Sequence, residues 1–298
     1  MTNTLLTKLE KKSNINIKVL PIFNKDKKRD SLEIYVKNQK FLKAEEVLRI
    51  FKINFNQDQP IAYALLDNEE KIVGFLGTIF SFQPIKEKFV EHCYLHSWVV
   101  NEQFRLEAFK LILPIIKKNI FISTYFPIKT LEGLYKKLGF EEIQFFSKII
   151  FLLPSFKFST NNLNLIEDNN YYEKYLKEKD KIFLKDHLKT ETRKIFIHFN
   201  EDLFNNILIV VKEKKFKNVI SYLEVIYISD QKIFKIHKKK ILFELSKKFK
   251  TLFFKFNYFE KDKEIFKSFY EIKNSRKKIF YLNKPLDFKI NFLYSELL

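Results

Sequence analysis

The chain has 298 residues and a mass of 36.2 kDa, which predicts two ordinary domains rather than one. Its residues are 46% hydrophobic and 17% aromatic, so the chain can bury a core and wholesale disorder is excluded. Four glycines and seven prolines exclude collagen-like and linker-like chains. The single cysteine, Cys93, excludes an internal disulfide framework and a multi-cysteine zinc or iron–sulfur site.

Membrane insertion is not expected. The longest stretches without a charge, such as residues 72–85, are shorter than the ~20 residues that a spanning helix needs. Lys8, Lys11 and Lys12 are followed by polar residues, which does not match the order of a signal peptide. We therefore expect a cytoplasmic protein without a membrane span. Nothing in the sequence predicts its oligomeric state.

The formal net charge is +19, which raises the question of a polyanionic partner. Only five of the 55 basic residues are arginine, and the lysines are interspersed with acids along the whole chain. Nucleic-acid sites favour arginine and clustered basic faces, whereas this lysine-rich composition is typical of an AT-rich genome. The densest basic run, residues 237–240, fits a solvated helix face. We expect no specific nucleic-acid partner. Weak, salt-sensitive attachment to DNA or to an anionic membrane stays open as a third alternative.

In the first half, apolar periodicity and turn residues predict mainly strands. A strand is expected at 17–23, a helix at 41–51, and a hairpin at 61–66 and 71–82 that contains Gly74 and Gly77. A long strand at 91–100 leads into a helical segment at 102–118. A strand at 119–126, a helix at 130–138 that ends at Gly139, and a strand at 141–153 complete this half.

Residues 155–170 are polar and rich in asparagine, which predicts a linker. We therefore expect domains at 1–156 and 157–298. The second half repeats the order of hairpin, long strand, helix, strand, helix and strand. Its expected elements are strands at 207–212 and 219–229, a helix at 231–248, a strand at 251–258, a helix at 264–272 and a strand at 278–282. The repeated order predicts a tandem of two related α+β units.

Three segments of the first half resemble motifs of one enzyme family. The first, ALLDNEEKIVGFLG (64–77), is similar to a hairpin with an I-V-G strand. The second, SWVVNEQFRLEAFK (97–110), is similar to a V-x-P-x-Y-R-x-x-G-x-G motif, and the third is LYKKLGF (134–140). In this order and spacing they resemble the GNAT superfamily of acetyl-CoA-dependent acetyltransferases.

This resemblance implies an α+β fold with two GNAT-like units, each a mixed, largely antiparallel central sheet flanked by helices. It implies an acyl-CoA-dependent N-acyltransferase that transfers an acetyl group from acetyl-CoA, or another acyl group from its acyl-CoA, to a primary amine. The acceptor would be a small molecule such as an amino sugar or small amine. The alternative is a non-catalytic GNAT-like binding or scaffold protein that has lost its cofactor loop.

The resemblance also implies where acyl-CoA binds. Backbone N–H groups of Val99 and Val100 would hold the pantetheine arm and polarise the thioester carbonyl. Amides of the following segment would hold the pyrophosphate. The two glycine positions of the family motif are Ala108 and Lys110 here, which puts the usual loop in question. The segment that the resemblance assigns to the cofactor is Phe104, Arg105, Leu106, Glu107, Ala108, Phe109 and Lys110.

Tyr135 occupies the position where many family members place a general acid that protonates the departing thiolate. An equal alternative is that Tyr135, one turn before the end of its helix, only packs its ring and extends its hydroxyl to water. Glu91 and His96 are the candidates for the group that accepts the amine proton. They lie five residues apart on one predicted strand, so at most one of them faces the cleft unless a bulge intervenes.

A metal site is not expected. Four residues of strand span ~13 Å, so His92 and His96 cannot bind one zinc ion together. In the second half, residues 225–228 take the place of 98–100, but no arginine-glycine turn follows. Asp230 is expected to cap a helix there, which would disfavour a second pyrophosphate site.

Overall fold

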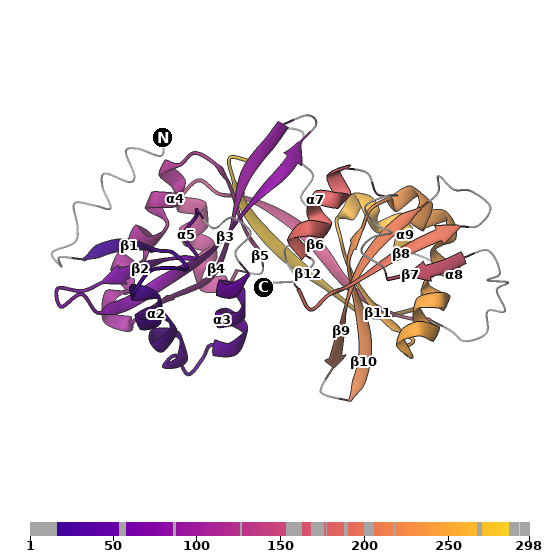
Figure 1. Cartoon of the computed structure of the whole chain (residues 1–298), viewed down its shortest axis with the longest axis horizontal. Coiled ribbons are helices and arrows are strands. Elements are labelled where there is room, and N and C mark those ends of the chain that lie inside the picture. The colour runs from indigo at the N-terminus through magenta and orange to yellow at the C-terminus, as the bar shows by residue number, and fades with distance from the viewer. Residues whose placement is uncertain are drawn as a thin grey trace. The chain divides into compact units, whose positions relative to one another are not determined.

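The structure is a computed structural model. It describes residues 17–53, 58–85, 88–125, 127–152, 163–167, 176, 178–187, 190–199, 206–216, 219–266, 270–285 and 292 (Figure 1). The chain divides into two compact units. Among the described residues, unit 1 holds 17–143 and 278–285, and unit 2 holds 144–277 and 292. This division differs from a linear split near residue 156, because residues 278–285 belong to unit 1.

Unit 1 is a mixed, largely antiparallel sheet with the strand order β1-β2-β3-β4-β5-β12. Only β4 and β5 run parallel; the other neighbours are antiparallel. Its strands are β1 (Lys18–Ile22), β2 (Ala62–Leu66), β3 (Ile72–Ile85), β4 (Lys88–Val100), β5 (Phe121–Tyr125) and the end of β12 (Tyr270–Leu282). Its helices are α2 (Lys28–Lys37), α3 (Ala44–Lys52), the 3₁₀ helix η1 (Glu102–Leu111), α4 (Leu113–Lys117) and α5 (Lys129–Lys137).

Unit 2 has the same pattern when its strands are read from the other edge, in the order β7-β8-β9-β10-β11-β6. Again one pair, β10 and β11, is parallel and the other described pairings are antiparallel. Its strands are β6 (Glu141–Phe151), β7 (Leu163–Ile166), β8 (Arg193–Phe199), β9 (Ile207–Phe216), β10 (Ile220–Ile228) and β11 (Phe253–Tyr258). Its helices are α7 (Glu178–His187), α8 (Gln231–Phe249), the 3₁₀ helix η2 (Glu260–Asp262) and α9 (Lys263–Phe266).

The two strand orders correspond position by position, but each unit takes its sixth strand from the other half of the sequence. The sixth strand of unit 1 is the end of β12, where residues 279–282 pair with β5. The sixth strand of unit 2 is β6, which follows the helices of unit 1 in sequence and pairs with β11 through residues 146–151. The two-unit α+β fold with mixed, largely antiparallel sheets flanked by helices is thus confirmed.

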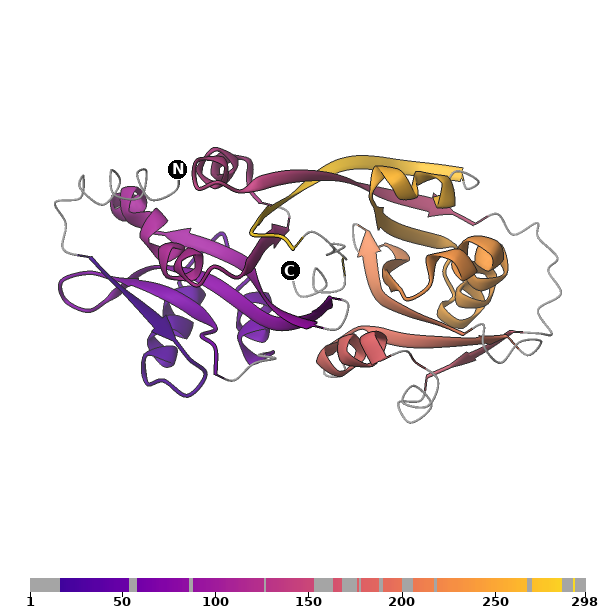
Figure 2. The same cartoon turned by 90° about the horizontal axis from the view of Figure 1, so that it is seen from above.

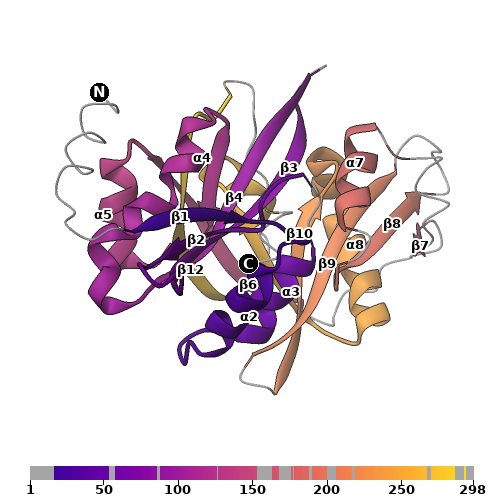
Figure 3. The same ribbon diagram turned by 60° about the vertical axis from the view of Figure 1, so that its left-hand side comes forward.

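Helices cover both faces of the unit 1 sheet (Figures 2 and 3). Helices α2 and α3 pack Leu32, Val36 and Phe51 on one face, over Phe75 and its neighbours. The other face is covered by η1, α4 and α5 through a separate apolar cluster. In unit 2, the inner face of α8 packs on strands β8–β11 with Phe234, Ile241, Leu242 and Leu245. Burial of these stripes provides the main stabilisation of both units.

Four predicted elements differ from the structure. Helix α2 was not expected, and the predicted linker 155–170 contains β7. The charged residues 213–215, which follow the strand predicted at 207–212, lie inside β9. The predicted helix 264–272 ends at Phe266, and β12 begins at Tyr270. In each case local composition was outweighed by pairing or packing with residues distant in sequence.

None of the helices in the described part of the chain is both long and apolar enough to cross a membrane.

Candidate active site

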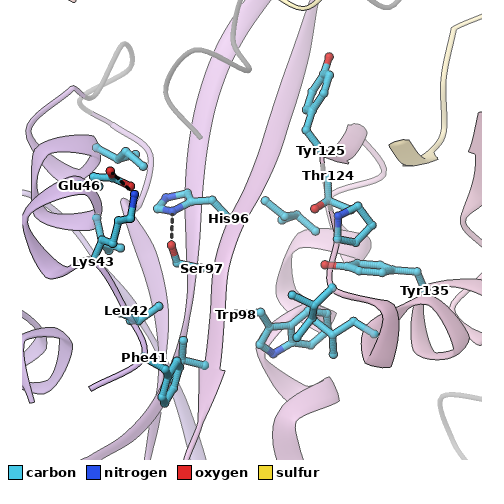
Figure 4. A pocket seen from close by; sticks show the side chains of 17 residues that line it. Phe41, Leu42, Lys43, Glu46, His96, Ser97, Trp98, Thr124, Tyr125 and Tyr135 are labelled. Carbon is cyan, nitrogen blue, oxygen red and sulfur yellow. Dashed lines mark hydrogen bonds and ion pairs between the residues drawn. The ribbon is translucent and has the colours of Figure 1, made fainter. Parts of the chain in front are cut away.

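The candidate site of unit 1 begins where two parallel strands separate. Strands β4 and β5 are paired from His92 and Phe121 as far as Leu95 and Thr124; β5 ends at Tyr125, while β4 continues to Val100. A cavity of about 390 Å³ opens there, and it lies within the typical range for small-molecule sites. Its lining comes from the segment before α3, α3 itself, β4, β5 and α5: Phe41, Leu42, Lys43, Glu46, Val47, Ile50, Leu95, His96, Ser97, Trp98, Val99, Thr124, Tyr125, Pro127, Ile128, Leu131 and Tyr135 (Figure 4).

A β-bulge shapes the strand at this point. Gly77 is opposite His96 and Phe75 is opposite Val99, so two residues of β4, Ser97 and Trp98, face one residue of β3. Ser97 takes the left-handed conformation with φ of 49°, which is uncommon for a residue with a side chain. The bulge places His96, Ser97, Trp98 and Val99 all on the wall of the cavity.

His96 lies at the centre of the lining, between α3 and β5 (Figure 4). Only 8% of the residue is exposed, and this burial lowers the pKa of the imidazole to about 3. Its Nδ1 is 3.0 Å from the Ser97 hydroxyl oxygen, while the buried Nε2 has no hydrogen-bond partner among the described residues. The imidazole is therefore neutral at neutral pH, and one of its two nitrogens is oriented by Ser97.

Tyr135 lies across the cavity from α3, in the last turn of α5. Its ring packs against Trp98, Phe140 and Phe280 at centroid distances of 5.2–5.6 Å, and the residue is only 2% exposed. The phenol forms a hydrogen bond with Thr124, but desolvation dominates and raises its pKa well above the usual value. Tyr135 is thus a protonated donor that lines the same cavity as His96.

Glu91 does not line this cavity. Its carboxylate accepts a hydrogen bond of 2.8 Å from the Gln59 side chain, and it is paired with Phe82 of β3. Of the two predicted proton acceptors, the structure therefore brings only His96 together with Tyr135.

The two predicted backbone amides differ in direction. The Asn101 N–H donates to Val73 of β3 at 2.9 Å, and N–H groups alternate in direction along a strand. The Val99 amide accordingly faces β3, while the Val100 amide faces the side from which β5 has departed. Val99 contributes to the cavity wall, and Val100 is not part of it.

Residues 104–110 form the body of the 3₁₀ helix η1, and none of them lines the cavity. Phe104 and Phe109 are buried in the core of unit 1. Arg105 is on the surface and pairs with Glu102 at 3.3 Å. Exposed Leu106 and half-buried Ala108 complete the segment, in which buried Glu107 pairs with Lys110 at 2.8 Å.

The contribution of α3 was missed by the sequence analysis. The amphipathic pattern at 41–51 predicted a helix with a core-facing side, but part of that side faces the cavity. An apolar stripe cannot by itself distinguish a core from a ligand pocket. At the rim, Lys43 and Glu46 form an exposed ion pair of 3.0 Å.

His92 and Cys93 of β4 are buried in the core and do not line the cavity. The His92 Nε2 is 2.9 Å from the Ser123 hydroxyl, its ring stacks on Phe121, and Cys93 is buried. Within the described residues, no group of three or more histidine, cysteine, aspartate or glutamate side chains is placed to hold a metal ion.

Unit 2 repeats the bulge on the strand that corresponds to β4. Strand β10 also has a bulge, between Val225 and Tyr227. Asp230 caps α8 as predicted, because its carboxylate accepts from the amides of Lys232 and Ile233. A smaller cavity of about 140 Å³ lies elsewhere, near Tyr222 and Thr251.

No protein-family model matches the sequence, and comparison with curated proteins gives no match either. Solved structures are similar in fold. A GCN5-related N-acetyltransferase from Anabaena variabilis has a TM-score of 0.60 at 12% identity, over 89% of this chain and 72% of that chain. A putative acetyltransferase from Pyrococcus horikoshii has a TM-score of 0.55 at 13% identity, over 93% and 92% of the two chains.

N-myristoyltransferase from Saccharomyces cerevisiae with bound myristoyl-CoA has a TM-score of 0.51 at 9% identity, over 90% of this chain and 79% of that chain. These identities are too low to carry an activity from one protein to another, but the fold agrees across the three. The chain has the fold of the GCN5-related N-acetyltransferase superfamily, as its three sequence segments predict.

Proposed function

We propose that the chain is an acyl-CoA-dependent N-acyltransferase whose reaction takes place in the cavity of unit 1. The observation that carries this proposal is the cavity that opens where the pairing of β4 with β5 ends, after Leu95 and Thr124. At this point the sheet is open to a ligand. The cavity is lined by both a neutral imidazole and a protonated phenol.

The proposed reaction is direct attack of a primary amine on the thioester carbonyl carbon. The C–N bond forms and the C–S bond breaks. The thiolate takes a proton from Tyr135, and the proton that the amine nitrogen loses passes to solvent, from which the phenol is reprotonated. The Val100 amide directly follows the cavity-lining residues 96–99 on β4 and faces away from β3, so it is suited to stabilise the carbonyl oxygen at the end of the cavity. Tyr135 is suited to protonate the thiolate, and His96 to accept a hydrogen bond from the amine.

The cavity lining favours a small amine with an apolar body over an amino sugar. Most lining residues are aliphatic or aromatic, and the charged pair Lys43–Glu46 is at the exposed rim. Hydroxyl groups of a sugar would be desolvated against such walls without enough partners, which costs free energy for each group. A primary amine on an aliphatic or aromatic body avoids that cost.

A non-catalytic GNAT-like binding or scaffold protein is the second candidate. It is favoured by one observation: η1 contains a buried carboxylate, Glu107, and contributes nothing to the cavity. On this alternative the cavity binds a ligand without turnover.

Two measurements test the proposal. Acetyl-CoA and coenzyme A are each titrated calorimetrically, and release of thiol from acetyl-CoA is followed while a panel of small primary amines and amino sugars is screened. Binding together with amine-dependent thiol release is the expected result. Binding without release for any amine would favour the scaffold, and absence of binding of both ligands at millimolar concentration would contradict the enzyme.

A further inference from the structure

We infer that the site recognises the acyl-pantetheine arm of its donor and makes no use of the diphosphate and nucleotide of coenzyme A. The donor class is then any acyl-pantetheine thioester, either free or attached to a carrier protein through a phosphopantetheine group. This inference rests on the proposed function and specifies the donor at the same site.

The argument begins with charge. The nucleotide half of coenzyme A carries a diphosphate and a further phosphate, and proteins bind such groups with unpaired backbone N–H groups and unpaired cations. In this chain, β4 leads directly through Asn101 into η1. Helix η1 therefore follows the open end of β4 directly and is placed to supply those groups.

The backbone of η1 has few amides to offer. The Phe104 N–H already donates to Asn101 at 2.9 Å, and at the far end the Ile112 N–H donates to Phe109. In a 3₁₀ helix each later amide bonds to the carbonyl three residues before it, so only Glu102 and Gln103 keep theirs free. A glycine-containing loop would expose more amides, but the four glycines of the chain are elsewhere: Gly74, Gly77, Gly133 and Gly139.

The side chains of η1 also disfavour the binding of an anion. Glu102 places a carboxylate at its first turn, and Arg105 is paired with that carboxylate. Glu107 is only 4% exposed and is paired with Lys110, so the second cation of the segment is also neutralised within the helix. Leu106, which is 88% exposed, places an apolar side chain on the outer surface. A diphosphate at η1 would meet the exposed carboxylate of Glu102, and each of the two cations of η1 already has a carboxylate partner.

The thioester end of the donor meets different surroundings. The cavity of about 390 Å³ is lined by His96, Trp98, Val99 and Tyr135, with apolar walls that suit an acyl group and the arm of pantetheine. Recognition is thus expected at the arm, where the sheet is open, and not at the nucleotide.

A series of donors that lose the phosphates and nucleotide of coenzyme A stepwise tests this inference: acetyl-CoA, acetyl-dephospho-CoA, acetyl-phosphopantetheine and acetyl-pantetheine. Dissociation constants are measured by calorimetry with the full chain, and amine-dependent thiol release is measured in parallel. We expect all four affinities to agree within about threefold, whereas each charge-assisted phosphate contact would be worth roughly tenfold or more. An acetylated acidic carrier protein is tested separately. Preference for this protein would identify a carrier protein as the source of the acyl-pantetheine group. Equal use of free acetyl-pantetheine would identify a free thioester as the donor.

Adenosine 3′,5′-bisphosphate serves as the matched competitor, because it contains phosphates without the arm. We expect no displacement of acetyl-CoA by this compound at millimolar concentration. Displacement, or acetyl-pantetheine binding roughly a hundredfold weaker than acetyl-CoA, would overturn the inference while the proposed function stands. Failure of all four donors to bind would overturn the proposed function itself.

Discussion

The imidazole of His96 lies over Gly77, in the space that a side chain at residue 77 would occupy. A Cβ atom built on Gly77 would be 2.7 Å from Nδ1 of His96 and closer still to Cε1 and Nε2. Real Cβ atoms do not approach other atoms so closely, so the ring position requires glycine on the neighbouring strand. The pairing of Gly77 with His96 next to the bulge thus determines where the ring sits in the cavity wall.

The first prediction concerns this pair. Gly77→Ala should displace the His96 ring, reduce amine-dependent thiol release and destabilise the protein by about 1–3 kcal/mol, as overpacking of a core does. Gly133→Ala is the matched control, because a Cβ there meets nothing within 4 Å and helix α5 favours alanine. It should be neutral or stabilise by up to about 1 kcal/mol. Equal effects of the two variants in urea unfolding would contradict the role of Gly77.

The second prediction separates catalysis by Tyr135 from packing. Tyr135→Phe keeps the ring contacts with Trp98, Phe140 and Phe280 and removes the hydroxyl. Turnover should fall by about 10²–10⁴-fold if the phenol is the general acid, with little change in the affinity for acetyl-CoA. Loss of the hydrogen bond with Thr124 should cost only about 1 kcal/mol of stability.

Thr124→Val is the matched control for Tyr135, since it removes the same hydrogen bond and leaves the phenol in place. It should reproduce the loss of stability but not the loss of turnover. If both variants retain the turnover of the parent, or both lose it equally, the hydroxyl of Tyr135 has only a structural role.

The third prediction concerns pH. Burial lowers the pKa of His92, His96 and His187 below the ordinary value of 6.5, to about 3 for His96 and His187. These rings are neutral in the folded protein, but the unfolded chain binds protons below pH 6.5. Stability is therefore fully present above pH 6.5 and declines as the pH falls toward 3.

Each buried histidine should contribute about 1 kcal/mol per pH unit to this decline. Urea unfolding at pH 7.5, 6.5 and 5.5 measures the slope, in a range where most carboxylates stay ionised. His92→Gln should reduce the slope, because one proton-binding group is removed from the unfolded chain. Stability that is constant between pH 7.5 and 5.5 would show that these rings are protonated equally in both states.

The fourth prediction concerns a buried ion-pair cluster in unit 2. Glu224 is 6% exposed and pairs with Lys255 and with Lys214, the latter at 2.7 Å. Burial alone would raise the pKa of Glu224, but the two lysines outweigh burial and hold it at about 2. This contribution is present above pH 4.5 and is lost as the pH falls toward 2.

Glu224→Ala should destabilise the protein by about 3 kcal/mol, because Lys255 is left buried without its counter-ion. Lys214→Met is the control, since the Lys214 side chain is 41% exposed and should cost less than about 1 kcal/mol. Both values come from denaturant unfolding at pH 7. A cost for Lys214→Met as large as that for Glu224→Ala would contradict this account of the cluster.

Much of the architecture could be predicted from local sequence. The hairpin of β2 and β3, the long strand β4, helix α5 with Gly139 in the left-handed conformation after it, and the cap of α8 at Asp230 all follow from short-range patterns. Such patterns report periodicity, capping and turn chemistry, which depend on neighbours within a few residues. The same kind of signal identified Tyr135 and His96 as candidates, although their roles stay predictions.

What the sequence by itself determined, then, is the α+β class, the repetition of the unit and the chemical groups available on β4 and α5. Only the tertiary structure decided that the end of β12 completes unit 1, that α3 lines the cavity, that Gly77 accommodates His96 and that η1 pairs its own charges. The reason is physical. Strand pairing and side-chain packing join residues that are tens to hundreds of positions apart, and their free energy is decided by which surfaces are buried together and not by the local preference of any segment.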